Sequence, residues 1–198
     1  MQSGLVINKY NHPDADCVTR TVETYLPSGV RALLEKSGAK IVPLTGTVTY
    51  RTASAELRTA HIDVDGWPVP PAGLYVVAER TVYLRSLSPM TIIHETMHAL
   101  DNALGGSLYL SSTEQEIRSA FKDARGFVTP YAASGLDEFF AECGRAFFNA
   151  NDARSPWPAA TPERLQKLSP AMFEFFSATV ARLEPSREVV QLQLVLTA

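Results

Sequence analysis

The chain has few cysteines, no basic block and no long apolar run. Two cysteines among 198 residues cannot make a disulfide framework, so we expect Cys17 and Cys143 to be free thiols. Apolar runs such as residues 74–78 are far too short to span a bilayer. Charge is balanced, with 18 basic and 21 acidic residues, and we therefore expect neither a nucleic-acid partner nor a membrane partner.

The N-terminus shows no signal peptide, because residues 1–4 are not a charged segment followed by an apolar run. This favours a cytoplasmic location or export by a non-classical route, and a secreted chain whose leader had been removed would look the same. With 45% hydrophobic residues, the chain can bury the core of a single domain over residues 1–198. We expect that domain to be a monomer.

Two of the four histidines fall in one pattern, His94-Glu95-x-x-His98. On a helix, residues four apart lie on one face, so the two imidazoles can hold one metal ion. Glu95 lies beside them, where a carboxylate can take a proton from a metal-bound water. Apolar neighbours indicate a buried helix, and they are Ile92, Ile93, Met97 and Leu100. The alternative is two histidines on an ordinary structural helix.

A catalytic zinc ion usually has three protein ligands and one open position. No histidine follows His98, so the third ligand must be acidic. Asp101 lies on the same rigid helix, too far along to complete a tetrahedron, and is expected to accept a ligand imidazole N–H. Glu138 and Glu142 share one face of a predicted helix rich in Phe and Ala, where two carboxylates are costly without a cation. We expect Glu138 to bind zinc and Glu142 to support a ligand.

Two predicted strands, residues 74–78 and 81–85, precede the metal helix. A free edge on the second strand could pair with an extended peptide across the metal. The cleft candidates on this strand are Val82, Tyr83 and Leu84. The proline-rich loop at residues 65–73 carries Trp67, which either walls the cleft or packs into the core. Residues 47–50 and the tail at 189–196 are two further predicted strands.

The chain resembles the gluzincin peptidases of the anthrax lethal factor catalytic-domain family, which includes the bacterial Pro-Pro endopeptidases. The shared features are His-Glu-x-x-His followed by Ala-x-Asp at residues 94–101, and the string Glu-Phe-Phe-Ala-Glu at residues 138–142. Tyr131 stands seven positions before Glu138, as a Tyr does in the family. The resemblance covers about residues 72–183.

This resemblance implies that His94, His98 and Glu138 bind one Zn²⁺ per chain. It also implies that Glu95 is the general base and that Tyr131 donates a hydrogen bond to the oxyanion. The expected activity is a zinc endopeptidase acting on proteins or peptides bound in extended form, and the Pro-Pro subgroup suggests a preference for proline-containing sequences. The alternative is a catalytically inactive zinc-binding module that binds a protein partner.

The expected fold is α+β and zincin-like. An N-terminal lobe, about residues 1–104, would carry helices and a small mixed sheet of three to five strands, with the metal helix at its end. A mainly helical C-terminal lobe, about residues 105–198, would supply Tyr131 and Glu138. The cleft would then lie between the lobes.

Overall fold

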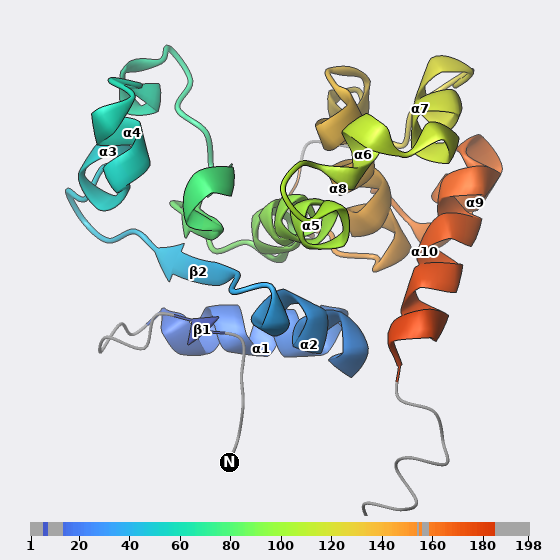
Figure 1. Ribbon diagram of the computed structural model, residues 1–198, viewed down its shortest axis with the longest axis horizontal. Coiled ribbons are helices and arrows are strands. Elements are labelled where there is room, and N and C mark those ends of the chain that lie inside the picture. The colour runs from blue at the N-terminus through green and yellow to red at the C-terminus, as the bar shows by residue number, and fades with distance from the viewer. Residues whose placement is uncertain (1–5, 8–13, 154, 156–158, 185–198) are drawn as a thin grey trace, which may run out of the picture.

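The computed structural model describes residues 6–7, 14–153, 155 and 159–184, which form helices around a small four-stranded sheet (Figure 1). The strands are β1 (Val6–Ile7), β2 (Lys40–Pro43), β3 (Gly73–Val76) and β4 (Thr81–Leu84). The α-helices are α1 (Ala15–Tyr25), α2 (Ser28–Lys36), α3 (Tyr50–Ala53), α4 (Ala55–Thr59), α5 (Pro89–Gly105), α6 (Leu110–Thr113), α7 (Gln115–Lys122), α8 (Leu136–Phe147), α9 (Pro162–Leu168) and α10 (Pro170–Leu183). Three short 3-10 turns are η1 (Val64–Gly66), η2 (Val77–Glu79) and η3 (Tyr131–Ala133).

The sheet is mixed, with strand order β1-β2-β4-β3. Strand β2 pairs in parallel with both β1 and β4, whereas β3 and β4 pair antiparallel, with Gly73 opposite Leu84 and Val76 opposite Thr81. Within the described sheet, β3 is therefore an edge strand and β4 is internal. The expected α+β fold with a small mixed sheet is confirmed.

The internal position of β4 corrects the predicted peptide-binding edge. Both edges of β4 are already paired, and Val82, Tyr83 and Leu84 are buried, with at most 6% of each residue exposed. The prediction that these residues line the cleft is therefore wrong. The β3–β4 hairpin joins neighbouring segments and is predictable from the local pattern. The pairing of β4 with β2 joins segments about forty residues apart, which a local pattern does not reveal.

Helix α5 runs through the middle of the molecule, with α1 and α2 on one side and α8 on another (Figure 1). Its start follows the predicted pattern: the Ser88 hydroxyl accepts the Thr91 N–H, and Pro89 occupies the first turn. Every residue from Thr91 to Asn102 is buried, so this helix has no solvent-facing side over three turns.

Among the described helices, none combines the length and apolar character needed to span a bilayer.

Two hydrophobic cores hold the elements together. The main core surrounds α5 and includes α1, α2, α8 and α10. A second, smaller core lies under α3 and α4, which stand apart from the helices around α5 (Figure 1). Its members are Tyr50, Leu57, Val64, Val76 and Tyr83. Because the second core includes β3 and β4 residues, it fixes α3 and α4 to the sheet rather than to α5.

Other local predictions differ from the structure. Residues 47–50 form no strand, because Thr49 and Thr52 make a reciprocal capping box that starts α3. The predicted strand at residues 189–196 lies outside the described residues. Cys17 and Cys143 are both free, as expected, and Cys143 is buried.

Helix α8 approaches α5 closely at Gly144, where a Cβ atom would lie 2.6 Å from the Met97 sulfur and 3.0 Å from Phe176. We expect Gly144→Ala to lower the free energy of unfolding by about 1–3 kcal/mol, because the added methyl overpacks this contact. Denaturant unfolding of the metal-free protein measures the change. Gly126→Ala is the control, since its Cβ would meet only Leu168 at an ordinary 3.5 Å. Equal stability of the two variants would contradict this view of the contact.

Candidate metal centre

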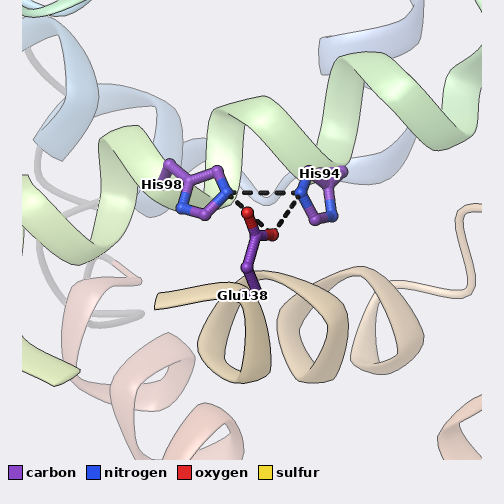
Figure 2. Close-up of side chains that lie close together, drawn as sticks. All are labelled: His94, His98 and Glu138. Atoms are coloured by element: carbon purple, nitrogen blue, oxygen red, sulfur yellow. Dashed lines mark hydrogen bonds and ion pairs between the residues drawn. The ribbon is translucent and has the colours of Figure 1, made fainter. Parts of the chain in front are cut away.

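Three side chains from two helices converge at one point (Figure 2). His94 and His98 project from α5, and Glu138 projects from α8 to meet them. The two Nε2 atoms are 3.2 Å apart, and Glu138 Oε2 lies 3.1 Å from His94 Nε2 and 3.4 Å from His98 Nε2. These residues, which the sequence pattern predicted to meet, form a group that could hold a metal ion.

The donor set fits a tetrahedral zinc ion. Bonds of about 2.0–2.1 Å to nitrogen and oxygen place tetrahedral ligand atoms roughly 3.3–3.4 Å apart, close to the separations observed here. Glu138 Oε2 is buried and, despite its nearness to both imidazoles, makes no hydrogen bond of acceptable geometry. The three donor atoms all lie within 4.8 Å of one another, and a cation held between them would satisfy the buried Glu138 Oε2.

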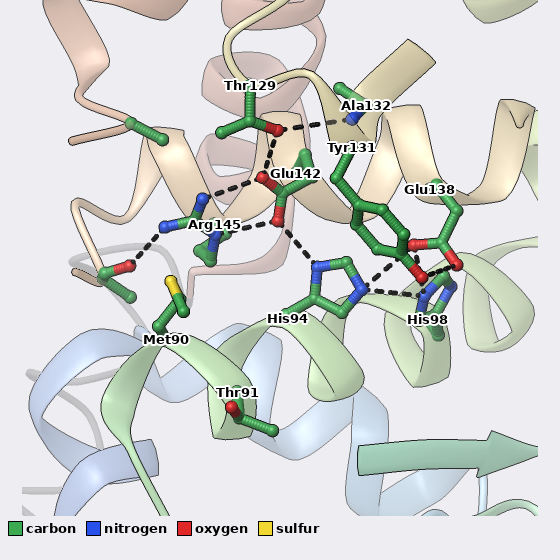
Figure 3. A network of polar contacts seen from close by, with 12 residues as sticks. Met90, Thr91, His94, His98, Thr129, Tyr131, Ala132, Glu138, Glu142 and Arg145 are labelled. Atoms are coloured by element: carbon green, nitrogen blue, oxygen red, sulfur yellow. Dashed lines mark hydrogen bonds and ion pairs between the residues drawn. The ribbon is translucent and has the colours of Figure 1, made fainter. Parts of the chain in front are cut away.

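Glu142 orients the first histidine (Figure 3). Its Oε1 atom lies 2.8 Å from His94 Nδ1, so this imidazole donates from Nδ1 and leaves Nε2 to face the centre. The same carboxylate accepts from Thr129 Oγ1 and, in a bidentate pair at 2.9 and 2.8 Å, from Arg145. The predicted support of a ligand by Glu142 thus has a defined geometry.

Arg145 is the functional residue that sequence reasoning missed. It is only 2% exposed, and its remaining donors reach Ala150 O at 3.0 Å and Asn151 Oδ1 at 3.1 Å. Its charge compensates the buried Glu142 carboxylate, so a bound metal is not needed for that purpose. The spacing of three residues from Glu142 was the available signal, because side chains three apart on a helix are neighbours.

Glu95 lies beside the centre with 8% of the residue exposed, in a gap that strand β3 leaves open. A Cβ atom at Gly73 would overlap Glu95 Cγ, so only glycine accommodates this side chain. Burial raises the pKa of Glu95, although the imidazoles of His94 and His98 act in the opposite direction. A raised pKa makes the carboxylate a stronger proton acceptor.

Tyr131 stands at the rim of the site, half-exposed, on the 3-10 turn η3 (Figure 3). Its hydroxyl donates to Glu138 Oε1 at 2.9 Å, and its ring centroid is 5.6 Å from that of His94. Burial and the nearby Glu138 carboxylate raise the pKa of the phenol, which therefore keeps its proton at neutral pH. A neutral phenol within reach of the centre is a hydrogen-bond donor.

Asp101 is fully buried but holds the backbone rather than an imidazole. Its Oδ1 atom accepts the Ser111 N–H at 2.8 Å, which ties the segment after α5 to the helix. Its Oδ2 atom and His98 Nδ1 are both buried without hydrogen-bond partners among the described residues. Asp101 therefore does not accept the imidazole N–H that the sequence predicted for it.

The cluster favours positive charge. Burial lowers the pKa of His94, but the carboxylates of Glu138 and Glu142 outweigh burial and raise that pKa to about 10. Burial raises the pKa of the Glu138 and Glu142 carboxyls. Interactions with the two imidazoles at Glu138, and with His94 and Arg145 at Glu142, nevertheless hold both pKa values well below the usual range. The same carboxylates would also favour a bound cation at this point.

A cavity of about 500 Å³ opens beside the centre. One side is the loop from Trp67 to Ala72, and another is the start of α5 at Met90 and Thr91. His94, Glu95 and Tyr131 line its inner end. Trp67 therefore lines the cavity instead of packing into the core, and 55% of the residue is exposed.

A search of solved structures found similarity to the Pro-Pro endopeptidase PPEP-2 from Paenibacillus alvei. The two structures superpose with a TM-score of 0.59 and share 23% sequence identity, over 91% of this chain and 96% of that chain. No protein-family model and no curated protein sequence matches the chain. The chain thus shares its overall fold with this Pro-Pro endopeptidase.

Replacing Glu142 with Gln tests its control of His94. The amide removes the charge that pairs with Arg145 and can present N–H instead of oxygen to His94 Nδ1, so we expect zinc affinity to fall about 10–100-fold. Competition with a chromophoric chelator measures that affinity. Glu163→Gln, on the exposed first turn of α9, is the matched control. Unchanged affinity in Glu142→Gln would contradict the orienting role.

Proposed function

We propose that the protein is a zinc-dependent endopeptidase. The observation that carries this proposal is the convergence of His94, His98 and Glu138 beside a buried carboxylate and a neutral phenol. A purely structural histidine pair would not need the additional Glu95 and Tyr131 at the mouth of a cavity. The shared fold with a Pro-Pro endopeptidase agrees with the proposal.

The chemistry follows from the position of each group. A bound zinc ion would polarise the scissile carbonyl and lower the pKa of a water molecule to about 7. Glu95 takes a proton from the attacking water and later delivers it to the leaving amine. Tyr131 turns its hydroxyl from Glu138 to the oxygen of the tetrahedral intermediate, where negative charge develops. Glu142 and Arg145 keep His94 in the tautomer that presents Nε2.

The substrate binds as an extended peptide along β3 rather than β4. The Arg85 N–H bonds to Ala72 O, so residues 72, 74 and 76 pair inward with β4. By the alternation of antiparallel pairing, Gly73 and Tyr75 direct their backbone groups to the other edge. Glu95 lies directly against Gly73 on this strand, since a Cβ atom at Gly73 would overlap Glu95 Cγ. A strand added there lies across the metal centre.

The cavity favours an apolar residue next to the scissile bond, and we propose proline for it. The wall contributes Trp67, Val69, Pro70 and Pro71, whose apolar surfaces suit a rigid ring and make no demand for a backbone N–H.

The proposal also includes a division into two lobes at about residue 104 and a monomeric state. The competing function is an inactive zinc-binding module that holds a protein partner at the same cavity.

Glu95→Gln separates catalysis from binding. The amide has nearly the same shape but cannot accept the proton, so we expect peptide cleavage to fall by about 10²–10⁴-fold while zinc content stays at that of the wild type. Cleavage of a blocked peptide library, read by mass spectrometry, measures the loss. Wild-type protein that holds zinc but cleaves no peptide would favour the inactive binding module.

Tyr131→Phe tests the oxyanion contact. Loss of the hydroxyl removes a bond that forms with developing charge, so we expect kcat to fall by about 10²–10³-fold with little change in KM. Tyr25→Phe, a change of the same chemistry on α1, is the control. A similar loss in both variants, or a change confined to KM, would argue against this role.

A further inference from the structure

The cavity wall from Trp67 to Ala72 has no regular secondary structure of its own. Three of its six residues are prolines, which offer no N–H for a hydrogen-bond ladder. Trp67 and Val69 are 55% and 83% exposed, so packing of these side chains fixes little of the wall. The backbone is bonded mainly at its two ends, at Trp67 N and at Ala72 O. The middle of the wall therefore needs another anchor.

Tyr50 provides that anchor. Its hydroxyl donates to Pro71 O at 2.8 Å, and its ring is fully buried in the second core. Burial raises the pKa of the phenol, so the hydroxyl remains a donor over the physiological pH range. Because Pro71 follows Pro70 directly, fixing this one carbonyl also limits the positions open to the neighbouring ring.

Tyr50 is itself held by Asp65 and Arg85. Asp65 accepts the Tyr50 N–H at 3.1 Å and forms an ion pair with Arg85. The Arg85 guanidinium lies 4.9 Å from the centroid of the Tyr50 ring, within the range of a cation–π contact. The backbone N–H of Arg85 also bonds to Ala72 O at 2.9 Å. One cluster thus connects both the phenol and the end of the wall to strand β4.

This cluster lies outside the metal centre. Tyr50 belongs to α3 and the second core, Asp65 belongs to η1, and Arg85 directly follows β4. The two histidines of the proposed metal centre belong to α5. A change at the phenol can therefore move the wall without moving the histidines. The contacts of Tyr50 lead to Pro71 and the cavity, and through them to a bound peptide.

We propose that Tyr50 is a positioning residue that, by holding Pro71 O, sets the separation between the apolar wall and helix α5 and so selects the peptide side chain that enters the cavity. This inference rests on the proposed function, because it assigns substrate selection to the same site. It adds a determinant of selectivity that touches neither the metal nor the reacting atoms.

Tyr50→Phe is the direct test, since it removes one hydroxyl and keeps the ring beside Arg85. The probes are blocked hexapeptides, Ac-Ala-Ala-X-Y-Ala-Ala-NH₂, with X and Y drawn from Pro, Leu, Ala and Lys. We expect unchanged zinc content, a KM about tenfold higher for the best peptide, and a smaller preference for it over the all-Ala peptide, as loss of one hydrogen bond would produce. A similar kcat would separate positioning from catalysis.

Tyr83→Phe is the matched control. Tyr83 shares the second core with Tyr50, but its hydroxyl donates to Glu79 at 2.8 Å instead of to the wall. We expect this variant to keep the wild-type preference among the peptides. Wild-type KM and preference in Tyr50→Phe, or the same loss of preference in both variants, would overturn the proposal while leaving the peptidase function standing.

If the wild type cleaves none of these peptides, that result counts against the proposed function itself. Peptide binding, measured by fluorescence, then tests the role of Tyr50 separately. Trp67 lines the cavity and is one of two tryptophans, so a Trp157→Phe background makes its fluorescence a specific reporter of peptide binding. Binding about tenfold weaker in Tyr50→Phe would support the positioning role without catalysis, as loss of one hydrogen bond would produce. Equal affinities, or no binding by the wild type, would overturn it.

Discussion

The close packing of α5 against α8 is the constraint on which the site depends. Two donors come from α5 and one from α8, so a shift of either helix separates Glu138 from the histidines. Gly144 permits the approach, and the Glu142 carboxylate links the helices by bonding to His94 as well as to Arg145 on its own helix. A carboxylate buried at such a contact is stable only when its charge is paired and its oxygens are satisfied.

The two hydrophobic cores hold different parts of the candidate site in place. The main core packs around α5 and α8, which carry the proposed metal ligands, while the second core contains Tyr50, which bonds to the cavity wall at Pro71. Strand β3 joins the two, since Gly73 makes room for Glu95 and Val76 packs into the second core. On the proposed function, residues near Tyr50 could therefore change substrate preference while His94, His98 and Glu138 keep their positions.

Local spacing predicts much of the candidate site, and features that depend on distant segments are not predictable in the same way. Residues four apart on a helix share a face, so the sequence alone pairs His94 with His98 and Glu138 with Glu142. The placement of β4 between β2 and β3 cannot be read from local spacing, because it depends on which strands pair. This placement leaves β3, not β4, as the edge strand next to α5. Asp101 was expected beside an imidazole, but the segment after α5 returns to place Ser111 N against it. The sequence pattern does not distinguish a metal ion from Arg145 as the counter-charge of Glu142, because either one can pair with a buried carboxylate.

The zinc content of the purified protein tests the central claim most directly. Elemental analysis of wild type, Glu138→Ala and the exposed control Glu163→Ala, after zinc addition and removal of excess metal, gives the stoichiometry. The three-ligand centre predicts about one zinc per chain in wild type and control and loss of zinc in Glu138→Ala. A folded wild-type protein without zinc, or full zinc occupancy in Glu138→Ala, would contradict the assigned centre.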